Sequence, residues 1–477
     1  MKKHLIYILF LLIILTGCSP KGEVKIEKLT IFALNDFHGD VLDETGNLSI
    51  IGNYLITEKE KSPESTIILA SGDMFQGSAI SNMTNGKVVL ESMEEIGFDS
   101  MTVGNHEFDW GVDVLSDLAS AAQFPFLGAN IYSKETNDRV NWLEPYTIIQ
   151  KGNIKVGIIG IIGEALTTDI SPSIIEPFKF VNEFETVTKY TKILRTEKDC
   201  DIIIVSAHNN TEKDNQRYAD LSGEYQIDAI FNAHSHSNYY GEILGEDGII
   251  MPYVQSGSVG QYIGKVEIQL DNNKMKDGSA YNLRVSNRMS SENTKLNAII
   301  KKYEDQTNIV SSEVLGISGR EINRGQGTSW AVDALRKATN VDIAVINTGG
   351  IRANGFPIYE NEAITVGHLW LIMPFDNIVK TVDMKAKDLN YVMSAGVILS
   401  SNASNEGGIF YINGNEIDPD TIIKVATIDY LFDNKNYNFI NGTNQVNTGT
   451  LFRDVLINNV REVCADGSKF YAYTLYR

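Results

Sequence analysis

Six short apolar runs, each followed by small polar residues or histidine, constrain the fold of this chain more than any other feature. They are rich in Ile, Val and Leu, alternate with longer helix-like segments, and cover Leu29 to Leu34, Thr66 to Ala70, Met101 to Val103, Val156 to Ile162, Ile202 to Val205 and Ile227 to Phe231. Short continuous apolar runs between helices are typical of buried strands in layered α/β folds. The pattern therefore predicts an α/β fold whose strands are covered on both faces.

Polar side chains follow these runs in five short segments: Asn35-Asp36-Phe37-His38-Gly39, Ser71-Gly72-Asp73, Gly104-Asn105-His106-Glu107, Ala207-His208-Asn209 and Asn232-Ala233-His234-Ser235-His236. In open α/β sheets the carboxyl ends of strands line the crevice where ligands bind, so we expect these side chains to meet. Taken singly, each segment would be an ordinary cap or hydrogen-bonding turn. Together they hold five of the seven histidines in the chain, which chance placement does not explain.

The donor types in these segments suit divalent metal ions. Carboxylates, an amide and imidazoles form a mixed oxygen and nitrogen set, which favours Zn, Mn, Fe or Co, whereas an all-oxygen set would suit Mg or Ca. Seven or eight candidate ligands imply two ions. Such a pair lowers the pKa of a bound water toward about 7 and neutralises charge on phosphoryl oxygens, as phosphoester hydrolysis requires.

His106 is the candidate proton donor of this site. It stands next to the candidate ligand Asn105, and Asp109 lies three residues further along. A carboxylate at that spacing can fix the imidazole tautomer and favour its protonated form. We therefore expect His106 to act as general acid or transition-state donor and Asp109 to orient it. The alternative is a helix-capping Asn-His pair without a catalytic role.

The pattern of the chain changes after Val266, where a polar stretch precedes a helix-like segment with one apolar side, formed by Leu296, Ile299, Ile300 and Tyr303. We expect a catalytic domain over 28–285, a linker helix over 286–310 and a second domain over 311–477. The second domain opens with a helix expected over Ser329 to Lys337, a strand over Ile343 to Ile346 and a Gly-rich turn. It is therefore also expected to be mixed α/β.

As a set, the motifs resemble those of the bacterial 5′-nucleotidase and UDP-sugar hydrolase family, which includes 2′,3′-cyclic-nucleotide phosphodiesterases. The resemblance runs from about residue 29 to about 440 and rests on Asn35-Asp36-Phe37-His38-Gly39, Gly72-Asp73-Met74-Phe75-Gln76-Gly77, Gly104-Asn105-His106-Glu107-Phe108-Asp109, His234-Ser235-His236 and Val254-Gln255-Ser256-Gly257. It implies a four-layer metallophosphoesterase sandwich followed by a smaller mixed α/β domain. It also implies one ion held by Asp36, His38 and His236, a second held by Asn105, His208 and His234, and Asp73 as the ligand that bridges both.

The same resemblance places nucleotide recognition in the second domain. Asn347-Thr348-Gly349-Gly350-Ile351-Arg352 follows the strand expected at Ile343. Arg suits phosphate because its planar fork binds two oxygens at once. The resemblance implies that the substrate contacts Asn347, Arg352, Phe375 and Asn377 of Pro374-Phe375-Asp376-Asn377, and Tyr430, with Arg320 and Arg324 as further candidate phosphate contacts. The alternative for Phe375 and Tyr430 is ordinary core packing.

Two departures from the family leave the activity open. Asn434-Lys435-Asn436-Tyr437 stands where the family has a Gly-Gly-Asp-Gly loop that contacts the nucleoside, so Asn436 replaces a carboxylate. Tyr430 at a stacking position also suits the cyclic phosphodiesterase branch. We expect hydrolysis of extracellular nucleotides to nucleoside and phosphate. The alternatives are a 2′,3′-cyclic-nucleotide 2′-phosphodiesterase/3′-nucleotidase, a UDP-sugar hydrolase, or a non-enzymatic surface binding lipoprotein on the same fold.

The N-terminus has the pattern of a targeting segment. Lys2 and Lys3 precede an apolar stretch, Leu5 to Leu15, with the charge and length of a secretory signal. Leu15-Thr16-Gly17-Cys18 resembles a bacterial lipobox, which implies a lipoprotein signal over 1–18 and acylation of Cys18. We therefore expect a membrane-anchored protein of the cell envelope, periplasmic or at the cell surface. The alternative is an ordinary cleaved signal.

Charge and cysteine content limit the other partners. The net charge of −20 argues against duplex nucleic acid as a partner, because non-specific binding needs a basic surface. Cys200 and Cys464 remain after Cys18, and they permit one disulfide, although buried free thiols fit equally well. Neither has the spacing of a metal ligand. The expected partners are a small nucleotide and, through the lipid, a membrane, and the oligomeric state is left open.

Overall fold

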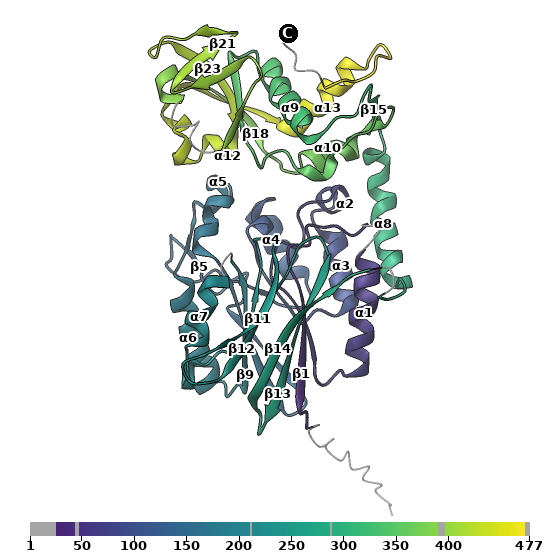
Figure 1. The fold of residues 1–477 in the computed structure, drawn as a ribbon, viewed down its shortest axis with the longest axis vertical. Helices are drawn as coiled ribbons and strands as arrows, with labels where there is room; N and C mark the ends of the chain where they lie inside the picture. Colours follow the sequence, from purple (N-terminus) through teal and green to yellow (C-terminus); the bar gives the residue numbers. More distant parts are fainter. Residues whose placement is uncertain (1–24, 43–46, 210–211, 287–288, 390–395, 473–477) are drawn as a thin grey trace, which may run out of the picture.

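The computed structural model describes residues 25–42, 47–209, 212–286, 289–389 and 396–472 of the chain. It consists of two bodies joined along one side by the long helix α8 (Thr294–Ser311) (Figure 1). The signal segment and Cys18 lie outside the described residues. Within the described ranges, no helix combines the length and apolar character that crossing a membrane requires.

Two sheets form the centre of the first body. One has the strand order β14 (Lys274–Arg284), β13 (Tyr262–Asp271), β1 (Lys28–Leu34), β2 (Thr66–Ala70), β3 (Ser100–Thr102) and β4 (Phe126–Leu127). The other has the order β11 (Asn238–Leu244), β12 (Ile250–Ser256), β10 (Ala229–Asn232), β9 (Ile202–His208), β7 (Ile154–Ile162) and β6 (Tyr146–Lys151). A short pair, β5 (Ile131–Ser133) and β8 (Phe178–Phe180), lies beside them.

Side chains of β1 alternate between two cores, as the two-residue period of a strand requires. Leu29 and Ile31 pack between the sheets, whereas Phe32 and Leu34 pack under the helices of the outer face. Those helices include α1 (Leu48–Lys61), α3 (Lys87–Ile96) and α4 (Val112–Ala121), while α6 (Glu183–Thr196) and α7 (Asn215–Ala219) cover the other sheet. The order of layers is therefore helix, sheet, sheet, helix, which confirms the four-layer sandwich expected from the sequence.

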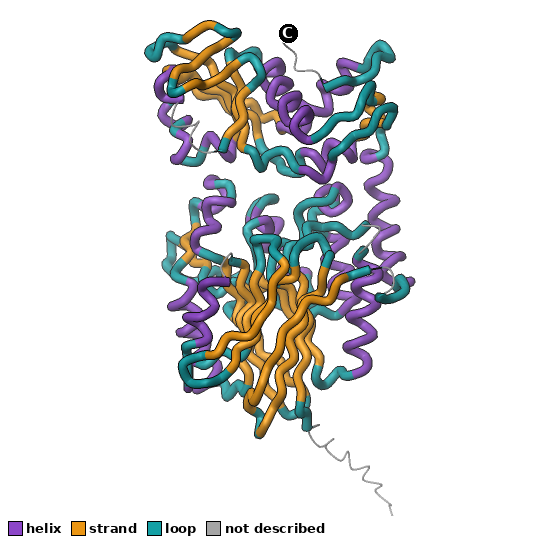
Figure 2. The backbone as a smooth tube through the Cα atoms, viewed as in Figure 1, coloured by secondary structure: helices purple, strands orange, loops and turns teal. Residues whose placement is uncertain are grey.

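The strand ends that carry the polar segments share one edge of the body. Strands β1, β2, β3 and β4 are parallel, as are β7, β9 and β10, and their carboxyl ends and loops face the second body (Figure 2). Strand β9 runs three residues further than expected, because its pairing with β7 continues to the Ile162 and His208 register. This extension brings His208 to the edge as part of the strand.

Helix α8 has the apolar side that the sequence predicts. Leu296, Ile300 and Tyr303 are buried in the core formed by α1 and α3, and Ile299 packs against that core. Asn293 caps the helix, its side chain accepting hydrogen bonds from the backbone N–H groups of the first turn. The linker helix is therefore packed along the first body.

The second body is built on a sheet with the order β19 (Val397–Leu399), β16 (Ile343–Asn347), β23 (Ile422–Ile428), β18 (Ile378–Lys385) and β24 (Thr443–Leu451). Its other elements are α9 (Arg324–Thr339), α10 (Val366–Ile372), α12 (Asp429–Phe432), α13 (Phe452–Val463), the pair β15 (Val314–Ile317) and β17 (Ala363–Thr365), and a small sheet of β20 (Ala403–Glu406), β21 (Ile409–Ile412) and β22 (Asn415–Glu416). The body is mixed α/β, as expected.

The helix expected from Ser329 begins more than one turn earlier. Asn323 and Gln326 form a capping box, in which each side chain accepts from the other residue's backbone N–H, so α9 starts at Arg324.

Cys200 is buried beneath the first body's second sheet and Cys464 ends α13 in the other body. Both are free thiols, which decides against the disulfide.

Candidate active site

Five residues that the sequence marks as ligands have left-handed backbone angles. The angle φ is +49° at Asp36, +53° at His38, +54° at Asp73, +73° at His234 and +56° at His236. Such a conformation costs a non-glycine residue about 1 to 3 kcal/mol and persists only where the surroundings enforce it. Strain of this kind clusters at functional sites, and these five positions all follow the carboxyl ends of buried strands.

Glycines allow these loops to approach one another. A Cβ added to Gly104 would lie 2.3 Å from Oδ1 of Asp73, and one added to Gly72 would lie 2.5 Å from Nδ1 of His208. Both distances are shorter than real Cβ contacts, so a larger residue would push the candidate ligands apart. The Ser-Gly-Asp and Gly-Asn-His-Glu segments therefore need glycine for close approach.

Asp36, His38 and His236 form the first group of donors, with ligand atoms within 4.8 Å of one another. Nδ1 of His38 donates to the carbonyl oxygen of Gln76 at 2.9 Å, which leaves Nε2 as the free base. That Nε2 lies 3.0 Å from Nε2 of His236. Two imidazole lone pairs converge in this way at a bound cation, so these residues fit a divalent metal.

Asp73, His208 and His234 form the second group. His208 donates from Nδ1 to the carbonyl oxygen of Ser71 at 2.8 Å, and its Nε2 lies 3.2 Å from Oδ2 of Asp73. Asn105 Oδ1 completes the group, 3.1 Å from His208 Nε2 and 2.9 Å from His234 Nδ1. An amide oxygen, a carboxylate and two imidazoles are ligands typical of Zn, Mn, Fe or Co.

The pKa values of these groups follow from burial and from their mutual charges. Burial raises the pKa of Asp36 to about 7 and lowers that of His234 to about 4. Burial also disfavours charge on His208, but the carboxylate of Asp73 outweighs it and raises the pKa of His208 to about 9. A cation in contact with Asp36 and His208 would displace their protons, so metal affinity should rise with pH.

Glu107 holds the Asp73 loop in place, a role for which the sequence carries no signal beyond membership of the Gly-Asn-His-Glu segment. Its buried carboxylate accepts backbone N–H groups of Asp73 at 2.8 Å, Met74 at 2.9 Å and Gly104 at 2.6 Å. Burial, followed by the charge of Asp73, raises the pKa of Glu107 to about 7. The residue therefore supports the backbone of a candidate ligand and belongs to neither donor group.

His106 and Asp109 form the expected pair. Nδ1 of His106 donates to Oδ2 of Asp109 at 2.7 Å, and the backbone N–H of His106 donates to Oδ1 of Asp73 at 2.9 Å. Burial lowers the pKa of His106, but the carboxylates of Asp109 and Asp73 outweigh burial, so the net pKa lies above the usual value. Nε2 of His106 lies 3.3 Å from Nη2 of Arg352 in the second body.

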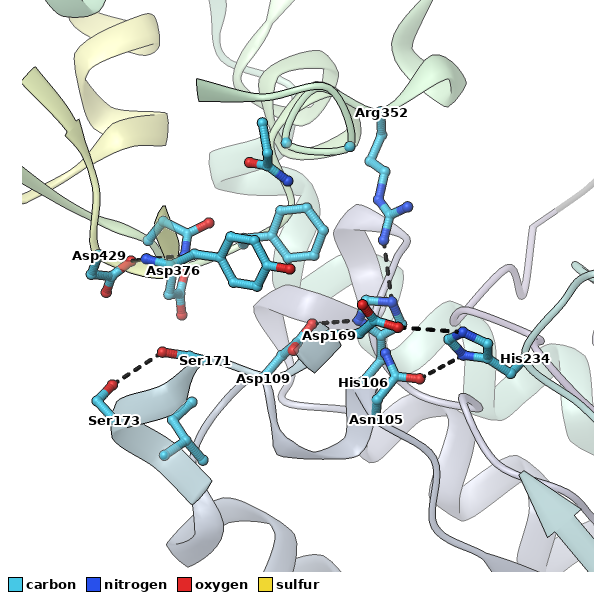
Figure 3. Close-up of a pocket in the computed structure, with 17 residues that line it drawn as sticks. Asn105, His106, Asp109, Asp169, Ser171, Ser173, His234, Arg352, Asp376 and Asp429 are labelled. Atoms are coloured by element: carbon cyan, nitrogen blue, oxygen red, sulfur yellow. Dashed lines mark hydrogen bonds and ion pairs between the residues drawn. The ribbon is translucent and has the colours of Figure 1, made fainter. Parts of the chain in front are cut away.

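A pocket of about 390 Å³ opens between the two bodies at this point (Figure 3). The first body contributes Asn105, His106, Asp109, Asp169, Ser171, Ser173, Ile174 and His234, and the second contributes Asn347, Gly349, Gly350, Arg352, Phe375, Asp376, Asn377, Asp429 and Tyr430. The structure thus brings five of the seven expected substrate residues to the candidate proton donor. The ring of Phe375 stacks on His106 at 6.1 Å, and Arg352 lies 4.9 Å above that ring.

Arg320 and Arg324 do not line this pocket. Arg320 donates from Nε to the carbonyl oxygen of Tyr471 at 2.9 Å. Arg324 donates to the carbonyl oxygens of Ile351 at 2.9 Å and Thr348 at 3.1 Å. Arg324 therefore supports the turn that carries Arg352. Sequence spacing could not reveal this, because Arg320 and Arg324 bond to carbonyl oxygens of distant segments, and such contacts leave no pattern in the sequence.

Arg453 fixes the loop that carries Phe375, and nothing in the sequence marks it. Its side chain is 3% exposed and contacts Oδ1 of Asp376 at 2.5 Å. It also donates to the carbonyl oxygens of Met373 and Phe375, each at 3.2 Å, and its guanidinium lies 3.4 Å above the Trp370 ring. A buried Arg held by this many groups makes the loop a rigid platform.

Asp429 orients the amide of Asn377, a role that nothing in the sequence marks. Nδ2 of Asn377 donates to Oδ1 of Asp429 at 2.8 Å, and the same oxygen accepts the backbone N–H of Tyr430 at 2.8 Å. Asn347 Oδ1 is buried and has no hydrogen-bond partner among the described residues. A buried acceptor of this kind at a pocket wall is suited to a ligand donor.

Comparisons with known proteins agree with this architecture. The calcineurin-like phosphoesterase family matches residues 29–238, and the 5′-nucleotidase C-terminal domain family matches residues 309–441. The fold resembles that of the 5′-nucleotidase precursor from Thermus thermophilus, with a TM-score of 0.77 at 19% identity over 91% of this chain and 96% of that one.

The chain is also similar in sequence to proteins of known name. The chain is 30% identical to Endonuclease YhcR of Bacillus subtilis over 80% of its own length, but it spans only 33% of that relative. It is 26% identical to the 5′-nucleotidase of Vibrio vulnificus, over 79% of this chain and 77% of the relative. The matching domains, the order in which they occur and the fold lead to one conclusion: the chain belongs to the family that joins a calcineurin-like phosphoesterase domain to a 5′-nucleotidase C-terminal domain.

Proposed function

We propose that the protein hydrolyses the phosphoester of extracellular nucleotides to nucleoside and phosphate, using a water activated by two divalent ions. The observation that carries the proposal is the pocket in which His106 and His234 of the first body face Arg352, Phe375 and Tyr430 of the second. A phosphate held at His106 and Arg352 leaves an attached base within reach of the two aromatic rings. The pocket volume of about 390 Å³ suits a ligand of this size.

We assign the two donor groups as the metal ligands. Asp36, His38 and His236 would hold one ion, Asn105, His208 and His234 the other, and Asp73 both. When bound, the ions supply an activated water and neutralise charge on the phosphoryl oxygens. His106 donates the proton that the leaving oxygen requires, from Nε2, while Asp109 accepts its Nδ1–H and stabilises the imidazolium.

The second body would select the nucleotide. Arg352 contacts the phosphate, Phe375 and Tyr430 enclose the base, and Asn347 and Asn377 contact its polar edge. Arg324 acts through the loop it supports, and Arg320, which is not part of the pocket lining, contacts the carbonyl oxygen of Tyr471. We propose that residues 28–285 form the catalytic domain, 286–310 the linker helix and 311–477 the nucleotide-specificity domain.

A substrate panel tests this function. Purified protein lacking residues 1–18 is incubated with AMP, UMP, a 2′,3′-cyclic nucleotide and UDP-glucose, in Mn²⁺ or Co²⁺ and after chelation. We expect phosphate release from the 5′-monophosphates, lost on chelation and regained with metal. Faster turnover of the cyclic nucleotide or of UDP-glucose would assign the protein to that branch. Metal binding without turnover of any member would favour the non-enzymatic alternative and overturn the proposal.

We also propose that the exported protein is anchored in the cell envelope through a lipid on Cys18. Substituting Cys18→Ser removes the thiol that the lipid modifies, so the protein should move from the detergent phase to the aqueous phase in Triton X-114 partitioning. Cys464→Ser, far from the signal, serves as the matched control and should leave partitioning unchanged. Retention of the Cys18→Ser protein in the detergent phase would contradict the anchor.

A further inference from the structure

Asp169 lies in the pocket between the metal donors and the aromatic rings (Figure 3). It ends the short helical segment Glu164–Asp169 of the first body, and its Oδ2 is 3.5 Å from Nε2 of His234. Burial, followed by the charge of Asp169, raises the pKa of Tyr430 to about 12. The same two causes raise the pKa of Tyr437. Asp169 is therefore close to both the catalytic end and the base end of the pocket.

Three other carboxylates line the pocket, and each accepts a hydrogen bond from a neighbouring side chain. Asp109 accepts from His106 at 2.7 Å, Asp376 from Arg453 at 2.5 Å, and Asp429 from Asn377 at 2.8 Å. Asp169 contacts Nε2 of His234 at 3.5 Å, and 45% of its side chain is exposed. Asp169 thus contributes a partly exposed carboxylate to the pocket wall.

The chemistry of the nucleotide decides what this oxygen can bind. If phosphate lies at His106 and Arg352 and the base lies between Phe375 and Tyr430, the sugar occupies the stretch beside Asp169. An ionised carboxylate only accepts hydrogen bonds, and phosphate offers it no donor. The sugar hydroxyls do offer hydrogen-bond donors. A hydrogen bond from a hydroxyl to a carboxylate is among the stronger hydrogen bonds in proteins.

We propose that Asp169 is a specificity-determining residue whose carboxylate accepts a hydrogen bond from a ribose hydroxyl, so that the pocket prefers ribonucleotides to deoxyribonucleotides. The inference rests on the proposed function and adds the sugar to it. Such a bond to a charged acceptor corresponds to a preference of about 10- to 100-fold in kcat/KM. A purely supporting role, with Asp169 orienting His234, predicts instead an equal loss on every substrate and a weaker hold on metal.

The test compares the wild-type protein with Asp169→Ala and Asp169→Asn on AMP, 2′-deoxy-AMP and 3′-deoxy-AMP at saturating Mn²⁺. We expect wild type to favour AMP over at least one deoxy analogue by about 10-fold or more. Asp169→Ala should lose that preference by losing rate on the substrates that carry the contacted hydroxyl, with unchanged metal content. Calorimetric binding of adenosine against the matching deoxyadenosine provides a readout independent of turnover. Glu164→Gln, exposed on the same segment and outside the pocket, is the charge-matched control.

The outcomes separate the two proposals. A wild-type protein that hydrolyses none of the three nucleotides overturns the proposed function, and this inference with it. A wild-type protein that hydrolyses them without any preference for ribose, or an Asp169→Ala variant that keeps the preference, overturns the inference alone. Equal losses on all three substrates together with reduced metal content would assign Asp169 to the support of His234.

Discussion

Substituting Asp73→Asn is expected to lower kcat/KM on nucleoside monophosphates by at least about 10³-fold, because metal ions supply several kcal/mol of charge stabilisation in the transition state. Asp73 is 1% exposed and is within 3.2 Å of His208, and it is the carboxylate that the proposal places on both ions. The asparagine amide has the same shape and can offer one oxygen to a metal ion. It carries no negative charge, so it cannot neutralise the charge of the two ions. The measurement is phosphate release at several Mn²⁺ concentrations, with bound metal quantified in parallel.

Asp113→Asn provides the control for Asp73→Asn. Asp113 is an exposed carboxylate in the first turn of α4 and lies outside both donor groups. The Asp113→Asn variant should keep full activity and full metal content. The Asp73→Asn variant should retain fewer than two metal ions per chain. An Asp73→Asn protein that is folded, fully loaded and active at the wild-type rate would show that the bridging ligand is misassigned.

The second large effect is expected at His106. Replacement by Ala should reduce the rate on nucleoside monophosphates by about 10² to 10⁴-fold, the usual contribution of a general acid. The loss should be much smaller on 4-nitrophenyl phosphate, because its leaving group departs as a stable anion without a proton. Metal content should not change, since His106 belongs to neither donor group. Equal losses on both substrates would remove the proton-donor role from His106.

Asp109→Asn serves as the companion variant, because it keeps a hydrogen-bond acceptor and removes the charge. A general acid works only while protonated, so the rate falls as pH rises through the pKa of His106. The charges of Asp109 and Asp73 place that pKa above its usual value against the effect of burial. Without the Asp109 charge the pKa drops, so the fall in rate should move to lower pH. A profile that keeps its position would show that Asp109 acts through geometry alone.

The strands that the sequence predicted in the first body are those buried on both faces, whereas β6, β11 and β14 have exposed positions and were not predicted. Every side chain of β2 and β9 is buried, so nearly every position must be apolar and the run stands out in the sequence. The expected and observed ends of an element differ where pairing or capping decides them. The β7 pairing extends β9 to His208, and the capping box of Asn323 starts α9 early.

The donor residues were predictable for a similar reason. Candidate ligands such as Asp36, Asp73 and His208 all follow or end buried strands, and a parallel sheet brings such ends to one edge. Residues that act through backbone atoms or through another side chain carry no such pattern. Glu107 and Arg453 bond to carbonyl oxygens and N–H groups that any residue type provides, so their roles emerge only from packing.

The sequence by itself determined the fold class, the order of the two domains and the chemical character of the site, because these depend on local apolar patterns and on residue type. The tertiary structure decided which candidates share a pocket. It brought Arg352 and Phe375 to His106, left Arg320 and Arg324 outside the pocket lining, and placed Asp169 beside His234. The physical reason is that contacts between distant segments depend on how two packed bodies meet, and no local pattern encodes that geometry.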